Sequence, residues 1–101
     1  MSVIVVFSTF PNEDKAADVA RTLVSEGLVA CANLVTTVRS IYRWQSELCD
    51  ERETLAMMKT TREHFDALKD RLVALHPYEV PEVIAVPVEA GHAPYLDWVA
   101  G

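Results

Sequence analysis

The chain has 101 residues, of which half are apolar and only three are glycine. This length predicts one domain over residues 1–101, and the apolar content excludes a disordered chain. Fifteen acidic residues against nine basic ones give a net charge of −6. That balance argues against nucleic acid or an anionic membrane as partner, because both select for clustered Lys and Arg.

Cysteine usage and the N-terminal segment indicate the compartment. The chain has two cysteines, Cys31 and Cys49, whereas a small secreted domain usually carries more, so the sequence favours a reducing environment. The first apolar run, residues 3–7, follows no basic segment and is too short for a signal peptide or a membrane span. We therefore expect a cytoplasmic protein.

The first part of the chain predicts a strand followed by a helix. Residues 3–7 are β-branched or aromatic, which is typical of a strand buried on both faces. Asn12 precedes two acidic residues and is the expected N-cap of a helix. Apolar residues recur at helical spacing as far as Leu23, and Gly27 lies where a left-handed C-cap is expected.

A long antiparallel hairpin is predicted next. Residues 30–38 have the composition of a second strand and residues 53–59 that of a third, with no helical pattern between them. The charged run at residues 50–53 is interpreted as a solvated turn. The hairpin therefore has a polar and aromatic connection.

A second helix should follow the third strand. Thr60 and Glu63 have the spacing of a capping box, which predicts the start of this helix. Pro77 should end it, because proline cannot continue the helical hydrogen bonds. The apolar face of this helix is expected to carry Phe65, Leu68, Leu72 and Leu75.

The last segments complete the predicted topology. Residues 83–88 predict a fourth strand at a sheet edge, because they include Pro87, and Pro94 suits the first turn of a short C-terminal helix. The order βαββαβ with an added helix predicts an α+β, ferredoxin-like sandwich with an antiparallel sheet. Right-handed crossovers place the first and third strands centrally. The uncharged edge at residues 32–35 is expected to pair with another subunit, so we expect a homo-oligomer.

Five separated blocks carry a family resemblance. They are Ala30–Asn33, Ser40–Trp44, Lys59–Thr61, His76–Glu82 and Tyr95–Trp98. Through these blocks the chain resembles the CutA divalent-cation tolerance proteins over nearly its whole length. The resemblance implies a ferredoxin-like fold, a tight homotrimer and a role linked to copper and other divalent cations, and it implies no defined reaction.

The resemblance also implies a metal site, which this chain matches only in part. The family's copper site uses a cysteine late in the first strand and two histidines before Pro-Tyr, and these positions hold Ser8, Leu75 and His76. Serine and leucine are poor copper ligands. We expect His76 and Cys31 to contact the metal, within one chain or across a subunit interface. Alternatively, Cys31 is a small buried hydrophobe and His76 caps the last carbonyls of the second helix.

A second set of residues is expected to line an inter-subunit cleft. Ionisable and aromatic side chains beside a proline-locked turn are typical of a small-molecule site. The set consists of Trp44, Lys59, Tyr78, Glu79, Tyr95 and Trp98. Lys59 and Glu79 are candidates for an ion pair there. The alternative is that the aromatic residues anchor the trimer interface.

No catalytic motif is visible. Cys31 lies among apolar residues, Cys49 is followed by acids that reduce thiol reactivity, and no phosphate loop or serine-nucleophile motif occurs. We expect no enzyme and no cofactor beyond copper or another divalent cation. The predicted function is that of a cytoplasmic, homotrimeric divalent-cation (copper) tolerance protein that binds metal weakly or indirectly. The alternative, by fold analogy, is a signalling module resembling the nitrogen-regulator PII trimers, with a small-molecule effector in the inter-subunit cleft.

Overall fold

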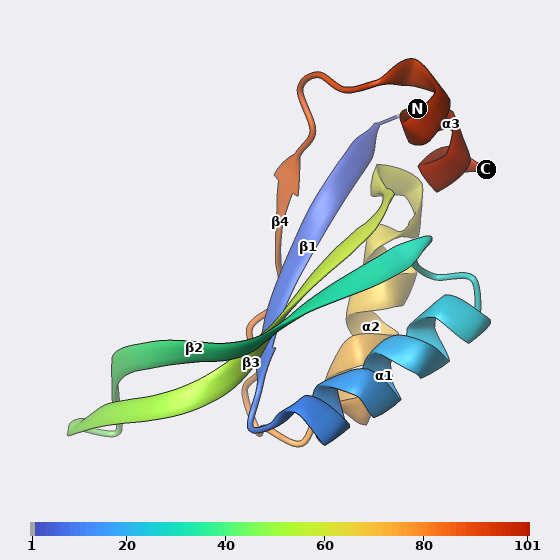
Figure 1. Cartoon of the computed structure of the whole chain (residues 1–101). Helices are drawn as coiled ribbons and strands as arrows, with labels where there is room; N and C mark the ends of the chain where they lie inside the picture. Colours follow the sequence, from blue (N-terminus) through green and yellow to red (C-terminus); the bar gives the residue numbers. More distant parts are fainter. Residues whose placement is uncertain (1) are drawn as a thin grey trace.

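A four-stranded antiparallel sheet in the order β2-β3-β1-β4 forms the centre of the computed structural model, which describes residues 2–101 (Figure 1). The elements are β1 (Val3–Phe10), α1 (Glu13–Ser25), β2 (Cys31–Trp44), β3 (Glu47–Thr61), a short 3₁₀ helix (Arg62–His64), α2 (Phe65–Leu75), β4 (Ile84–Pro87) and α3 (Ala93–Ala100). This order confirms the predicted ferredoxin-like α+β fold, with β1 and β3 central. Within residues 2–101, no helix is both long and apolar enough to cross a membrane.

One face of the sheet packs against α1 and α2 to form the core. Alternate residues of a strand point to the same face, so Ile4, Val6 and Phe10 of β1 all enter this core and are almost fully buried. The predicted apolar stripe of α2 is confirmed, since Leu68 and Leu72 are fully buried there. The other face of the sheet is only half-covered within one chain. The strand β1 is therefore not buried on both faces in a single chain, contrary to the prediction from its composition.

The helix ends follow local chemistry, with one exception. The Asn12 side chain accepts a hydrogen bond from the backbone N–H of Lys15 at 2.9 Å, which confirms the predicted N-cap of α1. Gly27 has a φ of +74°, the left-handed conformation expected after that helix. The predicted capping box is wrong: Thr60 lies in β3, and its hydroxyl donates to the carbonyl of Leu28 at 2.8 Å.

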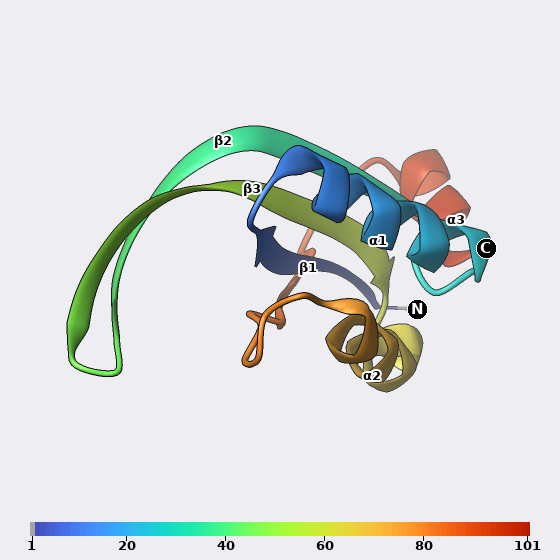
Figure 2. The same ribbon diagram turned by 90° about the horizontal axis from the view of Figure 1, so that it is seen from below.

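The β2–β3 hairpin is much longer than predicted. Its strands meet at a two-residue turn, Gln45 and Ser46, in which both residues have positive φ, as type I′ turns require. Residues 50–53 lie within β3, so the predicted solvated turn is wrong. A register shift between Val35 and Val38 marks a bulge, and bulges bend the strand that carries them. The hairpin accordingly extends beyond β1 and curls back (Figure 2).

The face of the sheet opposite α1 and α2 is largely apolar and partly exposed; we call it the open face. Two rows of cross-strand neighbours form its middle: Ile84, Phe7, Met57 and Asn33, and then Val86, Val5, Lys59 and Cys31. The side chains of Ile84 and Val86 are 56% and 45% exposed. From α3, Tyr95 reaches this face only at the Cys31 end. One chain therefore leaves a broad apolar surface exposed to water.

Candidate functional site

His76 immediately follows α2 and is held by the backbone on both sides. Its Nε2 lies 2.8 Å from the carbonyl oxygen of Thr9, and its Nδ1 lies 3.1 Å from the backbone nitrogen of Tyr78. Because that backbone N–H can only donate, Nδ1 accepts and Nε2 carries the proton. The ring stacks on Phe10 with 4.3 Å between centroids, and it is 8% exposed. Burial lowers the pKa of His76 below its ordinary value.

These contacts make His76 a connector between β1 and the turn after α2. A metal needs a free nitrogen lone pair, and the only lone pair of this ring points at the Tyr78 N–H. Within one chain, His76 therefore offers no ligand in the conformation seen here. The expected capping role is also corrected, because the ring bonds to Thr9 of β1 and not to the last carbonyls of α2.

The other two positions of the family's metal site lie in the interior of the protein. Ser8 is fully buried, and its hydroxyl has no hydrogen-bond partner among the described residues. Leu75 is partly buried and packs against the hydrophobic core. Among residues 2–101, no three His, Cys, Asp or Glu side chains are grouped so as to hold a metal ion.

Cys31 lies on the open face, away from His76. Its Sγ is 3.8 Å from the Tyr95 hydroxyl, and across the strands it neighbours Lys59, which in turn neighbours Val5. His76 instead contacts Thr9, four residues further along β1, or about 13 Å at the rise of a strand. The structure therefore does not bring Cys31 and His76 together within one chain, and their convergence between subunits stays a prediction.

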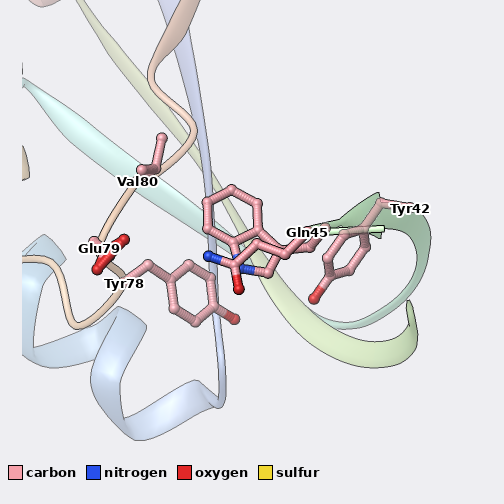
Figure 3. A pocket seen from close by; sticks show the side chains of 6 residues that line it. Tyr42, Gln45, Tyr78, Glu79 and Val80 are labelled. Carbon is pink, nitrogen blue, oxygen red and sulfur yellow. The ribbon is translucent and has the colours of Figure 1, made fainter. Parts of the chain in front are cut away.

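The residues predicted to line one cleft fall into two groups. Trp44, Tyr78 and Glu79 line a pocket of about 300 Å³ between the hairpin tip and the turn after α2 (Figure 3). Tyr95 and Trp98 lie on α3, with their ring centroids 5.8 Å apart. Lys59 lies on the open face and donates to the Asn33 side chain, so the predicted pair with Glu79 is not formed within one chain.

Several residues around this pocket were not predicted from the sequence. It is also lined by Tyr42, Gln45 and Val80. The Tyr78 hydroxyl donates to Glu53 at 2.5 Å, and the Tyr42 hydroxyl donates to Glu51. The sequence did contain a signal that the two glutamates act together, because residues 51 and 53 are two apart and therefore lie on the same face of a strand.

The carboxylates beside the pocket affect their neighbours' proton affinities. The pKa of Tyr78 is raised by burial and by its bond to Glu53, and the pKa of Tyr42 is raised mainly by its bond to Glu51. The pKa of Glu82 is raised by burial and by the charge of Glu53. Glu53 itself is 7% exposed, so the Tyr78 hydroxyl is an important partner for a buried charge. Both tyrosines therefore stay neutral and hydrogen-bonded at ordinary pH.

The sequence and the fold match one family over almost the whole chain. The model of the CutA1 divalent ion tolerance protein matches residues 4–101, and the chain therefore belongs to this family. The divalent-cation tolerance protein CutA of Thermus thermophilus is 48% identical over 94% of this chain and 92% of its own length. The human protein CutA is 47% identical over 97% of this chain, which spans 55% of the human protein.

Solved structures of relatives confirm the fold. The crystal structure of CutA from Xylella fastidiosa is similar with a TM-score of 0.94 at 40% identity, covering 98% of this chain and 95% of that one. The Thermus thermophilus divalent cation tolerance protein has a TM-score of 0.93 at 47% identity, covering 97% and 95%. The long hairpin and the C-terminal helix thus belong to a shared architecture.

Proposed function

We propose that this protein is a cytoplasmic, homotrimeric divalent-cation tolerance protein that binds copper or another divalent cation weakly and catalyses no reaction. The observation that carries the proposal is the family match over residues 4–101, together with relatives that are named divalent-cation tolerance proteins. The two free cysteines agree with a reducing compartment. The family match gives no support to the PII-like signalling alternative.

The open face supports the self-association in this proposal. Exposed apolar side chains such as Ile84 and Val86 lie beside half-buried Val5 and Phe7, so the patch is continuous across β4 and β1. Such a patch on a small protein usually marks an interface. The outer edge of β2 also has no strand partner among residues 2–101. Packing against further copies would cover both features at once.

Cys31 is the better candidate of the two predicted metal contacts. The His76 nitrogens are both engaged, whereas the Cys31 thiol has only a weak contact at 3.8 Å to Tyr95. Thiolates are preferred ligands of Cu(I). One soft ligand per chain agrees with weak binding.

The test compares two cysteine variants in titrations with Cu(I) and with the divalent ion Zn(II), both under anaerobic conditions. Cys31→Ser should weaken binding by at least about tenfold, since it replaces the soft ligand, while the matched control Cys49→Ser should leave it unchanged. Equal binding by Cys31→Ser and the unmodified protein would exclude Cys31 as the contact. In cells, deletion of the gene should reduce growth at raised copper, and growth identical to the parent strain would contradict the tolerance role.

A further inference from the structure

The pocket at the hairpin tip has an unusual lining for a protein surface; we call it the hairpin pocket. It is lined by Tyr42, Trp44, Gln45, Tyr78, Glu79 and Val80. Three of the six side chains are aromatic, one is a carboxylate, and none is basic. Its volume of about 300 Å³ is at the lower end of the range for ligand sites. The pocket therefore suits a small molecule with a positive or neutral charge.

The hairpin carries Glu51 and Glu53 on one face and its arginines on the other. Asp50 also lies on the arginine face, where its carboxylate pairs with Arg39 at 2.7 Å. Tyr42 bonds to Glu51, so these residues share one face, and Glu53 lies on it two positions further along β3. Arg39 is the cross-strand neighbour of Arg52, which lies between the two glutamates and therefore points the opposite way. The acidic face is thus the face that turns toward the pocket, and the arginines point away from it.

Hydrogen bonds hold the two tyrosines of the pocket in place before any ligand arrives. The hydroxyl groups of Tyr42 and Tyr78 point toward each other from two sides of the pocket (Figure 3). Each hydroxyl donates a hydrogen bond to a glutamate of β3. The lone pairs of the tyrosine oxygen therefore stay available to accept a hydrogen bond from a ligand. Burial and, second, the charge of Glu53 raise the pKa of the nearby Glu82. A site fixed in this way loses little entropy when it binds.

We propose that the hairpin pocket binds a small organic cation, with a quaternary ammonium group as the best-fitting chemistry. The faces of Trp44, Tyr42 and Tyr78 attract a diffuse positive charge. Glu79 at the rim, with Glu51 and Glu53 behind the tyrosines, adds negative potential. The site lies within one chain, at a distance from Cys31, and does not depend on the metal role proposed above.

A metal ion is a poorer occupant of this pocket. The carboxylates of Glu51 and Glu53 each accept a tyrosine hydroxyl, and no metal-holding group of three ligands occurs in the described part of the chain. Aromatic faces contribute little to a small, strongly hydrated ion but favour a large cation with a weak hydration shell. The geometry therefore separates organic cations from divalent metals.

The experiment is calorimetric titration of the full chain with choline and with its uncharged isostere, in which a quaternary carbon replaces the nitrogen. Choline should bind saturably and at least about fivefold more tightly than the isostere, because only the cation interacts with the ring faces. Trp44→Leu should weaken choline binding at least about fivefold. Trp98→Leu is the matched control, since Trp98 is exposed on α3 outside this pocket, and it should bind as the unmodified protein does.

A fluorescence titration locates the binding. The chain has two tryptophans, so Trp98→Phe leaves Trp44 as the reporter in the pocket, and Trp44→Phe leaves Trp98 as a reporter outside it. Choline should change the emission of the first variant and not that of the second. Three results would each overturn the proposal. They are equal binding of choline and the isostere, no binding of choline, or an equal loss of choline affinity in Trp44→Leu and Trp98→Leu. Glu79→Gln, which keeps the rings in place, should also weaken choline binding and leave the isostere unaffected.

Discussion

Replacing His76 by phenylalanine tests whether this residue is a structural connector. The substitution keeps an aromatic ring to stack on Phe10 but removes both hydrogen bonds, leaving the Thr9 carbonyl and the Tyr78 N–H without partners. An unsatisfied buried group costs about 1–3 kcal/mol. Thr9 and Tyr78 are only half-buried, so we take the lower figure for each and expect His76→Phe to lower the free energy of unfolding by about 2 kcal/mol.

His76→Ala should cost more, because it also removes the stacked ring. An aromatic pair adds about 0.5–1.5 kcal/mol beyond the area that it buries, so we expect a total loss of about 3–4 kcal/mol. The measurement is urea unfolding at one fixed chain concentration, because self-association stabilises the folded state. The control is His92→Phe, which changes an exposed histidine that has no side-chain capping bond. A loss below about 0.5 kcal/mol for His76→Phe, the usual range for surface substitutions, would refute the reasoning.

The same residue makes stability depend on pH in a defined direction. Burial holds the pKa of His76 below 6.5, the ordinary value that applies in the unfolded chain. The unfolded chain therefore takes up the proton first as pH falls, and protonation favours unfolding. The contribution is complete above about pH 6.5 and is lost as pH falls toward the folded-state pKa. The difference in urea midpoint between the unmodified protein and His76→Phe should shrink from pH 8 to pH 5, and a constant difference would show that His76 does not titrate.

Three further substitutions test local features by the same urea unfolding. Tyr78→Phe should cost about 1.5–3 kcal/mol, because the buried Glu53 carboxylate loses its hydroxyl donor, and a neutral result would contradict that bond. Asn12→Ala should cost about 1 kcal/mol through loss of the N-cap of α1, whereas Asn12→Asp should cost far less. Gly27→Ala should cost about 1 kcal/mol, although no atom lies within 4 Å of the added Cβ, because its φ is +74°. An unchanged midpoint for Gly27→Ala would exclude the left-handed conformation in solution.

Hydrophobic periodicity was enough to predict the order and pairing of the strands. Each of these features can be read from neighbours close in sequence: the β-branched run of β1, the apolar stripe of α2 and Pro77 just after that helix. The hairpin length was missed for a physical reason. Residues 50–52 are exposed and charged although they lie in a strand, and such a composition is equally typical of a solvated turn.

The site was harder to predict than the fold. Within one chain Trp44 and Trp98 lie apart, because the hairpin extends away from the rest of the sheet after its bulge, and a register shift leaves no simple signal in composition. Their grouping in a cleft between subunits stays a prediction. The role of His76 depends on a carbonyl 67 residues away in sequence, at Thr9. The pairing of Tyr78 with Glu53 likewise joins two segments that only the folded chain brings together. Residue types were therefore predictable at these positions, but their partners were not.

The most direct test of the proposed assembly is sedimentation equilibrium of the unmodified protein at micromolar concentration. The open face, with its exposed residues Ile84 and Val86, and the unpaired edge of β2 both need further copies to cover them. We predict a single species with the mass of three chains, without dissociation on dilution through that range. A mass of one chain would contradict it, since the open face would then remain exposed to water in the working protein.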